Sequence, residues 1–465
     1  MTTDAGRRRL SLFDATMLVM GGVIGVGIFF TPGSVAQLLP TPGLFFGAWL
    51  LGGLVALAGA MTFAELAASF PHAGGWYVYL REAFGRLPAF LFAWIVLLVV
   101  STGAAAVVAD FCAQKVAVLL WGLPAADGTG GAPPHGVLAI GAALLVGLTL
   151  VSLAGVKSGA LLQNAVMLLK LGAIAALAGA ALLVADAAAG AAGGVAAAAL
   201  ATGTPSPAAP SPGRGLVLAM LPVLFSYGGW QLITYIAPLV RDPQRTLPRA
   251  IVLGMLGVVA VYLAMNLAFV KVLGLPAMAS EPDIAARLAH ASLGSAGGKL
   301  LVAAMAVSAL GICAAIVLAS PFLYVAMAED GLFFRRFGKL SPRTGAPVAA
   351  LLVQGAVALL YLLWVSVDKA SAERLTDSVV FAEWIFHAQC GAALLLLRRR
   401  RPELSRPFRS PLYPLFPALY TAMASAVVIG ALLQAEPRKT LLGLGVLAAG
   451  AAVYRPWRAL LARGG

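Results

Sequence analysis

Charged residues are scarce in this sequence. Asp, Glu, Lys and Arg together make up 11% of the 465 residues, whereas hydrophobic residues make up 61%. A water-soluble protein of this length could not cover its surface with so few charged side chains. The composition therefore predicts an integral membrane protein built from α-helices, because a helix satisfies its own backbone hydrogen bonds in lipid.

Cysteine and histidine are also rare, with three and four residues respectively. Cys112, Cys313 and Cys390 all lie in apolar segments, so we expect three buried thiols and no disulfide-linked subunit. No cysteines or histidines have the spacing of metal ligands, and no nucleophile–base or acid pair is recognisable at membrane depth. These absences predict no metal, no cofactor and no enzyme activity.

Apolar runs long enough to cross a hydrocarbon core of about 30 Å recur along the whole chain. The twelve predicted spans are 12–37, 43–70, 86–118, 136–156, 160–188, 214–240, 247–275, 298–328, 346–366, 376–397, 412–434 and 439–456. The first run follows three arginines as a signal peptide would, but its length and Asp14 favour a retained helix. Ser11 and Asp14, at N-cap and N3 spacing, predict where that helix starts.

The net charge of +14 becomes informative once the charges are placed on these spans. With the N-terminus in the cytoplasm, most Lys and Arg residues fall in inner segments. This positive-inside bias predicts a multi-pass protein of the inner (cytoplasmic) membrane with both termini in the cytoplasm. The four arginines at 398–401 then follow the tenth helix and face anionic membrane lipid, so we expect no nucleic acid partner.

Two predicted spans are interrupted by glycine: residues 19–33 read VMGGVIGVGIFFTPG, and residues 224–235 read LFSYGGWQLITY. Irregular backbone at membrane depth is tolerated only where it lines a cavity. The carbonyls that end one half-helix suit an ammonium group, and the free N–H groups that begin the next suit a carboxylate. The breaks therefore predict a binding site for an amino acid zwitterion. Close helix packing by small residues is the alternative.

The second break comes five helices after the first, as an inverted-repeat transporter requires. We predict an all-α integral membrane protein of about twelve helices: a 5+5 inverted repeat with broken helices one and six, plus two extra helices. The predicted divisions are an N-terminal tail (1–11), the first repeat (12–188), a flexible outer loop (189–213), the second repeat (214–397), a basic cytoplasmic loop (398–411), and helices eleven and twelve with a tail (412–465).

Five segments carry a family resemblance. They read GGVIGVGIFFTP, TFAELAASFPHAGGWYVYLREAFG, FSYGGWQ with RDPQRTLPRAI, LASPFLYVAMAEDGLFFRRFGKLSPRTGAPVAAL and RRRRPELSRPFRSPLYPLFP, in that order. Together they resemble the amino acid–polyamine–organocation superfamily of transporters, and within it bacterial relatives of the L-type amino acid transporters. The resemblance covers nearly the whole chain and implies an amino acid permease that functions as a monomer.

The resemblance also implies roles for the residues of the first break, 23–27. The Val23 carbonyl would receive the substrate amine, and the N–H groups of Val26 and Gly27 would hold its carboxylate. Ile24 belongs to the same unwound stretch, and Gly25 would permit the unwinding.

In helix six, Phe225 would be an aromatic gate over the substrate. More unwound backbone would come from Ser226, Gly228 and Gly229, and part of the side-chain pocket from Trp230 and Gln231. The pocket so defined contains no acid, so a neutral amino acid is favoured over a cationic amino acid or a polyamine.

The sequence departs from the family at two acidic positions. Relatives commonly have a Glu pair where this chain has Pro238 and Leu239, and an acid where it has Trp76. An inner gate held by those carboxylates must be built differently here. We expect either that other residues form the gate or that Pro238 kinks the inner half-helix.

Lys170 lies about ten residues inside helix five, on the order of 15 Å deep at 1.5 Å per residue. An intramembrane lysine is a candidate functional residue. In the superfamily, a lysine in this region resembles one whose ammonium takes the place of sodium and links helices one and eight. This role argues for proton coupling, exchange or facilitated diffusion, and pairing with backbone carbonyls alone is the other possibility.

Glu383 and His387 are four residues apart in helix ten and share a helical face. We expect the pair in the outer half of the membrane, where it would relay protons or form an ordinary polar contact. The sequence as a whole predicts alternating-access transport of a neutral amino acid, by proton symport or exchange. A membrane sensor or scaffold that retains the transporter fold without transporting is the rival hypothesis.

Overall fold

The structure is a computed structural model that describes residues 10–463, except for 123–132, 193–210, 282 and 435–436. The described residues form helices and no strand. In chain order the helices are α1 (Leu12–Val23), α2 (Gly27–Leu38), α3 (Pro42–Ser69), α4 (Trp76–Phe84), α5 (Arg86–Ile95), the π-helix η2 (Val96–Val100), α6 (Ser101–Trp121), α7 (Pro134–Ala154), α8 (Val156–Ala192), α10 (Pro212–Ser226), the 3₁₀ helix η4 (Trp230–Leu239), α11 (Pro243–Leu273), α12 (Leu275–Ser280), α13 (Ile284–Ala319), α14 (Pro321–Glu329), the 3₁₀ helix η5 (Arg335–Gly338), α15 (Val348–Val367), α16 (Lys369–Arg400), α17 (Leu415–Gln434) and α18 (Pro437–Arg463).

Every predicted span contains a helix, which confirms the all-α membrane fold. Within the described residues, eight helical segments are long and apolar enough to cross a membrane, and the bent pair α1–α2 makes a ninth. Helices α16, α17 and α18 occupy the last three predicted spans. The division into two inverted repeats stays a prediction, and most of the expected outer loop (189–213) lies outside the described residues.

The predicted start of the first helix is confirmed in detail. Ser11 is the N-cap of α1, and its hydroxyl oxygen accepts a hydrogen bond from the Asp14 N–H. The Asp14 carboxylate accepts one from the Ser11 N–H at 2.8 Å. These two bonds form a capping box, which satisfies two of the N–H groups left free at a helix start.

The eighth span is longer than the sequence indicated. Helix α13 begins at Ile284 instead of near residue 298, because the Asp283 carboxylate accepts from the Ala286 N–H and caps an earlier start. Gly294 has φ of +59° and ψ of −142°, so a kink separates this first part from the long apolar run. The apolar pattern predicted the second part only.

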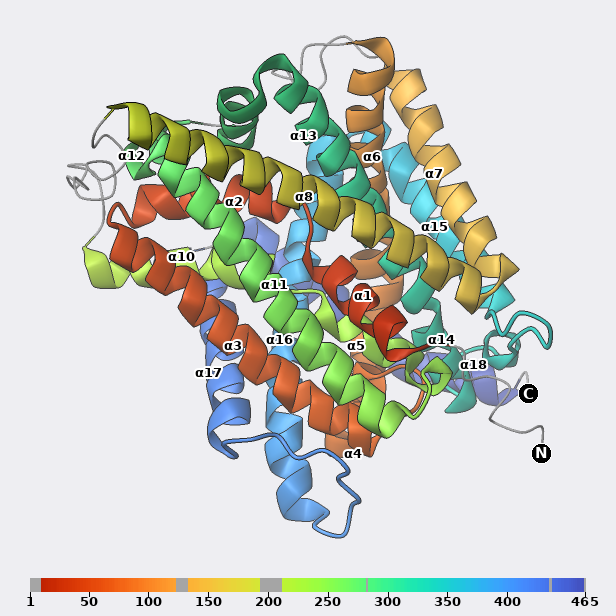
Figure 1. The fold of residues 1–465 in the computed structure, drawn as a ribbon. Helices are drawn as coiled ribbons and strands as arrows, with labels where there is room; N and C mark the ends of the chain where they lie inside the picture. The colour runs from red at the N-terminus through yellow and green to blue at the C-terminus, as the bar shows by residue number, and fades with distance from the viewer. Residues whose placement is uncertain (1–9, 123–132, 193–210, 282, 435–436, 464–465) are drawn as a thin grey trace.

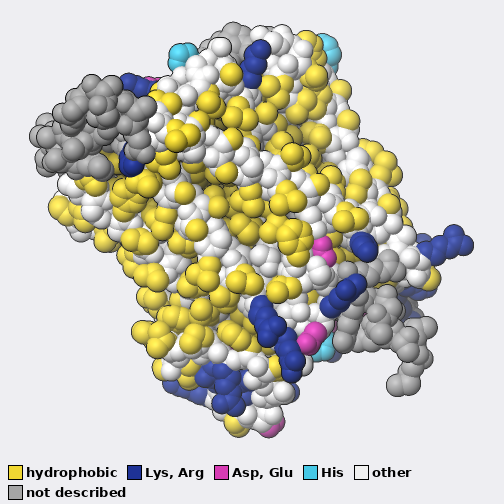
Figure 2. Space-filling view, viewed as in Figure 1, with side chains coloured by type: hydrophobic (Ala, Val, Ile, Leu, Met, Phe, Trp, Pro, Cys, Tyr) yellow, Lys and Arg dark blue, Asp and Glu magenta, His cyan; other side chains and the backbone are white. Residues whose placement is uncertain are grey.

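The first half of interrupted helix one lies within the bundle. Helix α1 packs against α8, α11, α13 and η4, and Figure 1 shows it between the long tilted helices α8 and α11. Much of the outer surface is hydrophobic (Figure 2). Exposed leucines such as Leu120, Leu183 and Leu360 are 65–73% accessible, which suits a surface that faces lipid.

One side of the molecule carries the start of α1, the end of η4, the start of α11 and the end of α16, and we call it the basic side. It is tied together by a short parallel bridge between Leu10 and Val240. The Leu10 N–H donates to the Leu239 carbonyl at 3.0 Å, and the Arg241 N–H donates to the Leu10 carbonyl at 2.9 Å. The segment before α1 is thus joined to the segment after η4.

Candidate functional site

The first helix is broken where the sequence predicts it. Helix α1 ends at Val23 and α2 begins at Gly27, with a bend of 46° between them. Ile24 caps α1 in an extended conformation, with ψ of 95°. The last carbonyls of α1 and the first N–H groups of α2 therefore lack partners within their own helices. These are the main-chain groups that a zwitterion would need.

The sixth helix is broken in the same way. Helix α10 ends at Ser226 and η4 begins at Trp230, with Gly228 and Gly229 between them. Gly229 has φ of +112°, which side chains with a Cβ atom rarely adopt. The glycine is therefore required by the backbone conformation of this break.

The two breaks meet. A Cβ atom added to Gly229 would lie 2.1 Å from the Gly22 carbonyl oxygen, and one added to Gly22 would lie 2.7 Å from the Gly229 carbonyl oxygen. The Ser226 hydroxyl donates to the Thr31 hydroxyl at 3.0 Å and so joins the other halves of the same helices. The predicted residues 23–27 and 226–229 are therefore brought together, and close backbone approach is part of the reason for the glycines.

Tyr262 of α11 connects both breaks, and the sequence reasoning missed it. Its hydroxyl lies 3.0 Å from the Val23 carbonyl oxygen and 2.8 Å from the Ser226 carbonyl oxygen. The ring is fully buried against the rings of Trp49 and Tyr227. Because one hydroxyl hydrogen serves two carbonyls, the Val23 carbonyl keeps hydrogen-bonding capacity for a second donor.

Lys170 of α8 lies against the first break. Its side chain is 1% exposed, and Nζ donates to the Ile24 carbonyl at 2.5 Å. The Ser308 hydroxyl of α13 donates to the same carbonyl at 3.4 Å. A Cβ atom on Gly311 of α13 would lie 3.0 Å from Nζ. The Lys170 Nζ thus lies between broken helix one and α13, and its role in coupling stays a prediction.

The expected pocket residues of helix six differ in their exposure and in their contacts. Phe225 is 61% exposed, so it does not cover the breaks in this conformation. Trp230 is buried against Phe63, with ring centroids 4.8 Å apart. The Gln231 side-chain oxygen accepts from the Gly229 N–H at 3.0 Å, which occupies it with the break itself. The roles of these side chains toward a substrate stay predictions.

A cavity of about 20 Å³ lies beside the second break, large enough for about one water molecule. Its wall includes Gly228 and Trp230 of the broken helix, His387 of α16 and Tyr420 of α17. None of its lining residues carries a carboxylate.

His387, the histidine of the predicted Glu383–His387 pair, packs beside the second break. His387 contacts the Tyr420 hydroxyl through Nδ1, and its ring lies 4.4 Å from that of Trp76 in α4. The imidazole therefore lies beside the cavity at the second break. The depth of the Glu383–His387 pair in the membrane and its role in proton relay stay predictions.

The basic side is closed by residues other than the missing family acids. Arg81 of α4 pairs with Asp330 after α14 and with Glu82, and Arg401 pairs with Glu82 at 2.8 Å. Burial alone would lower the pKa of Arg81, but hydrogen bonds to Asp330 and Glu82 hold its pKa above the ordinary value. The Gly74 N–H also donates to the Tyr235 carbonyl of η4 at 3.0 Å.

At the positions where relatives have acids, this chain has side chains that make packing contacts and no ion pairs within the described residues. The Trp76 ring stacks on Phe92 with centroids 5.0 Å apart. Ile236, two residues before Pro238 in η4, has non-helical φ and ψ of −103° and 21°. A kink is therefore present beside Pro238, as expected for a residue that cannot continue helical hydrogen bonding.

The described residues contain no group of three or more His, Cys, Asp or Glu side chains that could hold a metal ion. The three cysteines are free and buried, as expected. The candidate site is therefore made of main-chain groups, one ammonium group and a few hydroxyl and aromatic side chains.

A helical membrane protein whose two interrupted spans meet at the centre of the bundle has the architecture of a secondary transporter that binds its cargo near the membrane midplane. The amino acid permease family model matches residues 10–442. The chain belongs to this amino acid permease family.

Several transporters are similar to this chain over nearly its whole length. The serine/threonine exchanger SteT of Bacillus subtilis is 29% identical over 458 residues, covering 97% of this chain and 98% of the relative. The b(0,+)-type amino acid transporter 1 of Mus musculus is 28% identical, covering 94% and 85% respectively. The large neutral amino acids transporter small subunit 2 of Mus musculus is 27% identical, covering 96% and 80%. These relatives are amino acid transporters and not enzymes.

Proposed function

We propose that this permease exchanges neutral amino acids across the cytoplasmic membrane by alternating access. The arrangement of the two breaks carries the proposal. Main-chain carbonyls at the end of α1 face an ammonium group, and the first N–H groups of α2 face a carboxylate, so the backbone recognises what all amino acids share. The substrate's own side chain then points toward helix six and the residues around it.

A neutral substrate is supported by the absence of acids among the predicted pocket residues of helix six, which are Phe225, Ser226, Trp230 and Gln231. A cationic side chain placed there would lose its hydration without gaining a carboxylate partner, which is costly in a buried site. Two similar transporters are named for serine/threonine and for large neutral amino acids. We therefore propose neutral amino acids, without choosing a side-chain size.

Exchange independent of sodium is supported by Lys170. Its Nζ already donates to the Ile24 carbonyl, so a sodium ion would have to displace this side chain to bind at the same carbonyl. The name of one similar transporter, a serine/threonine exchanger, points the same way. Proton symport remains as the outcome that the experiment below would reveal.

The orientation and assembly belong to the same proposal. We place the basic side in the cytoplasm, because most Lys and Arg residues lie on the segments that would face it. One relative is named as a small subunit, but all three cysteines of this chain are buried. We therefore propose that it works as a monomer without a disulfide-linked partner.

The test is uptake of labelled neutral amino acids into proteoliposomes. Vesicles would be preloaded with unlabelled amino acid or left empty, with and without an inward proton gradient. Exchange predicts uptake that needs the internal load and is insensitive to the gradient and to sodium. Parallel vesicles with labelled lysine and putrescine test the neutral preference.

Each other outcome identifies a rival. Gradient-driven uptake into empty vesicles would establish proton symport, and preferential uptake of lysine or putrescine would overturn the neutral substrate. No uptake by protein that binds a neutral amino acid and unfolds cooperatively would favour the membrane sensor over the transporter.

A further inference from the structure

A groove of about 690 Å³ opens at the edge of the basic side, away from the two helix breaks. It lies between the start of α11, the last turns of α3 and the segment 407–411 that follows α16. Nothing in the proposed transport reaction uses it. Its wall combines arginines with apolar side chains, so it suits a ligand that has both an anionic and an apolar part.

Three arginines line the groove: Arg245 and Arg249 from α11, and Arg409 from the following loop. Arg245 has a loose ion pair with Asp242, with atoms 3.9 Å apart and both side chains more than 60% exposed. Such a pair is worth little in water. Within the described residues, no carboxylate pairs with Arg249 or Arg409. The groove therefore carries uncompensated positive charge.

The rest of the wall is apolar and continues into the lipid-facing surface. Met61 of α3, Val252 of α11 and Phe408 contribute to it. Leu253, also in the groove, is 50% exposed, and Leu256 one turn further along α11 is 49% exposed. Figure 2 shows Lys and Arg side chains gathered at one end of this face, with a mainly hydrophobic surface beyond them. Charge and hydrocarbon surface thus meet as they do at a membrane interface.

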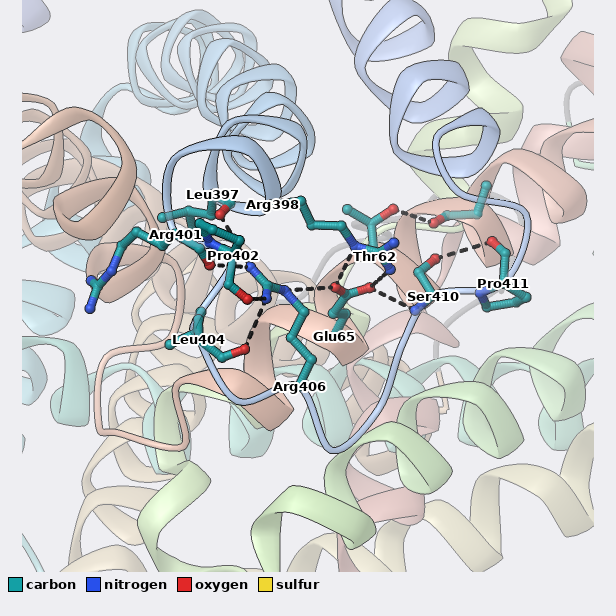
Figure 3. A network of polar contacts seen from close by, with 11 residues as sticks. Thr62, Glu65, Leu397, Arg398, Arg401, Pro402, Leu404, Arg406, Ser410 and Pro411 are labelled. Atoms are coloured by element: carbon teal, nitrogen blue, oxygen red, sulfur yellow. Dashed lines mark hydrogen bonds and ion pairs between the residues drawn. The ribbon is translucent and has the colours of Figure 1, made fainter.

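The loop that carries Arg409 is held in place by a buried carboxylate. Glu65, at the end of α3, is fully buried and accepts a hydrogen bond from the Ser410 N–H at 2.7 Å (Figure 3). Arg398 donates to both oxygens of Glu65, at 2.8 and 2.5 Å. Arg406 lies 3.6 Å from Glu65 and donates to the carbonyls of Leu397, in the last turn of α16, and of Arg401, just after it. These contacts fix the backbone at Ser410 and so hold the adjacent Arg409 at the groove.

We propose that this groove binds an anionic phospholipid of the inner leaflet, with its phosphate between Arg249 and Arg409 and its acyl chains along Leu253 and Leu256. Arginine pairs with phosphate through several donors at once. A soluble anion would leave the apolar part of the groove uncovered, whereas a diacyl lipid covers both parts. The N-terminal tail does not suit the groove, because Arg7, Arg8 and Arg9 give it the same sign of charge.

The test is native mass spectrometry of the detergent-purified full chain titrated with palmitoyl-oleoyl phosphatidylglycerol. Palmitoyl-oleoyl phosphatidylcholine, with the same acyl chains, serves as the zwitterionic comparison. The first bound phosphatidylglycerol is expected to bind more tightly than phosphatidylcholine. The double variant Arg249→Gln/Arg409→Gln is expected to lose this preference, by about fivefold per arginine and about 25-fold for both.

The matched control is Arg335→Gln/Arg336→Gln, which removes the same charge from exposed residues of η5 outside the groove. It is expected to keep the preference. An equal loss in both double variants would mean diffuse attraction by net charge and would overturn the site. Displacement of the lipid by millimolar inorganic phosphate would overturn the diacyl occupant. Cooperative thermal unfolding of each variant would establish that binding is compared between folded proteins.

Discussion

Two side chains, Lys170 and Tyr262, hold the carbonyls of the first break from opposite sides. Lys170 reaches the Ile24 carbonyl from α8, and Tyr262 reaches the Val23 carbonyl from α11. Neighbouring carbonyls that would repel one another in an unwound helix each have a donor. Lys170 and Tyr262 bind no substrate in our proposal, but they stabilise the conformation of the backbone that does.

Lys170→Ala is expected to reduce amino acid exchange by about fivefold or more, because the Ile24 carbonyl would keep only the long hydrogen bond from Ser308. An unsatisfied buried group costs about 1–3 kcal/mol, and about 1.4 kcal/mol corresponds to tenfold. Counterflow in proteoliposomes measures the effect. Lys299→Ala, an exposed lysine of α13, is the control and should exchange at the wild-type rate. Wild-type exchange by Lys170→Ala would refute the role of the ammonium group.

Tyr262→Phe is expected to lower the free energy of unfolding by about 1–3 kcal/mol, because two buried carbonyls lose their shared donor. It should also raise the KM for exchange, since the Val23 carbonyl is no longer held in place. Thermal unfolding and initial exchange rates are the measurements. Tyr361→Phe alters a partly exposed tyrosine that packs against Trp364, and it should change neither quantity. A stability loss without any change in KM would restrict Tyr262 to a structural role.

The sequence could predict Lys170 but not Tyr262. A lysine in an apolar run is conspicuous because burying a charge is expensive. A tyrosine is ordinary in a membrane helix, and its partners lie 36 and 239 residues away along the chain. Asn266, one turn further in the same apolar run, was the available signal that this face of α11 is polar.

At the scale of helices, the contact between the two breaks explains why both need glycine. Each break unwinds its own helix, and each also makes room for the backbone of the other at Gly22 and Gly229. Unwinding alone would tolerate several small residues. Backbone contact tolerates none larger than glycine at these two positions.

Gly229→Ala is expected to abolish exchange and to reduce the yield of folded protein. The added Cβ atom would lie 2.1 Å from a backbone oxygen, at a φ of +112° that alanine rarely adopts. Backbone strain of this kind is among the largest single-residue effects. Gly172→Ala, where a Cβ atom meets nothing within 4 Å, should retain exchange and yield. Size-exclusion chromatography and counterflow distinguish the two, and normal exchange by Gly229→Ala would refute the close contact.

Helix positions were predictable because the membrane imposes a length and a hydrophobicity on each span. Helix boundaries set by polar capping groups were harder to predict. Ser11 could be recognised from its spacing to Asp14. Asp283 was missed, because the loop before it gives no signal of a helix start. The ion pairs at the ends of helices were not predictable. Arg81 and Asp330 are 249 residues apart, and only the folded chain brings them together.

For the whole molecule, alternating access as we propose it requires a path between the breaks and each side of the membrane in turn. The ion pairs of Arg81 and Arg401 join segments of the basic side. We expect them to separate when a path opens on that side. Ion pairs that are only partly buried suit this purpose, because they are cheap enough to break in each cycle.

Asp330→Asn is expected to increase the rate of amide hydrogen exchange in residues 76–84 about fivefold, which corresponds to a loss of about 1 kcal/mol for a partly buried ion pair. The reason is that Arg81 would lose its partner across the closed side. Hydrogen exchange followed by mass spectrometry measures the change. Glu281→Gln breaks the ion pair with Arg287 and should leave residues 76–84 unaffected. Unchanged exchange in Asp330→Asn would show that packing alone keeps this side closed.

The bridge between Leu10 and Val240 connects the two broken helices at their ends on the basic side. Because these backbone bonds join the segment before α1 to the segment after η4, we expect the two half-helices on the basic side to move together. A substrate that binds at only one break would then displace both half-helices. Leu10 thus couples the two halves of the site without contacting the substrate itself.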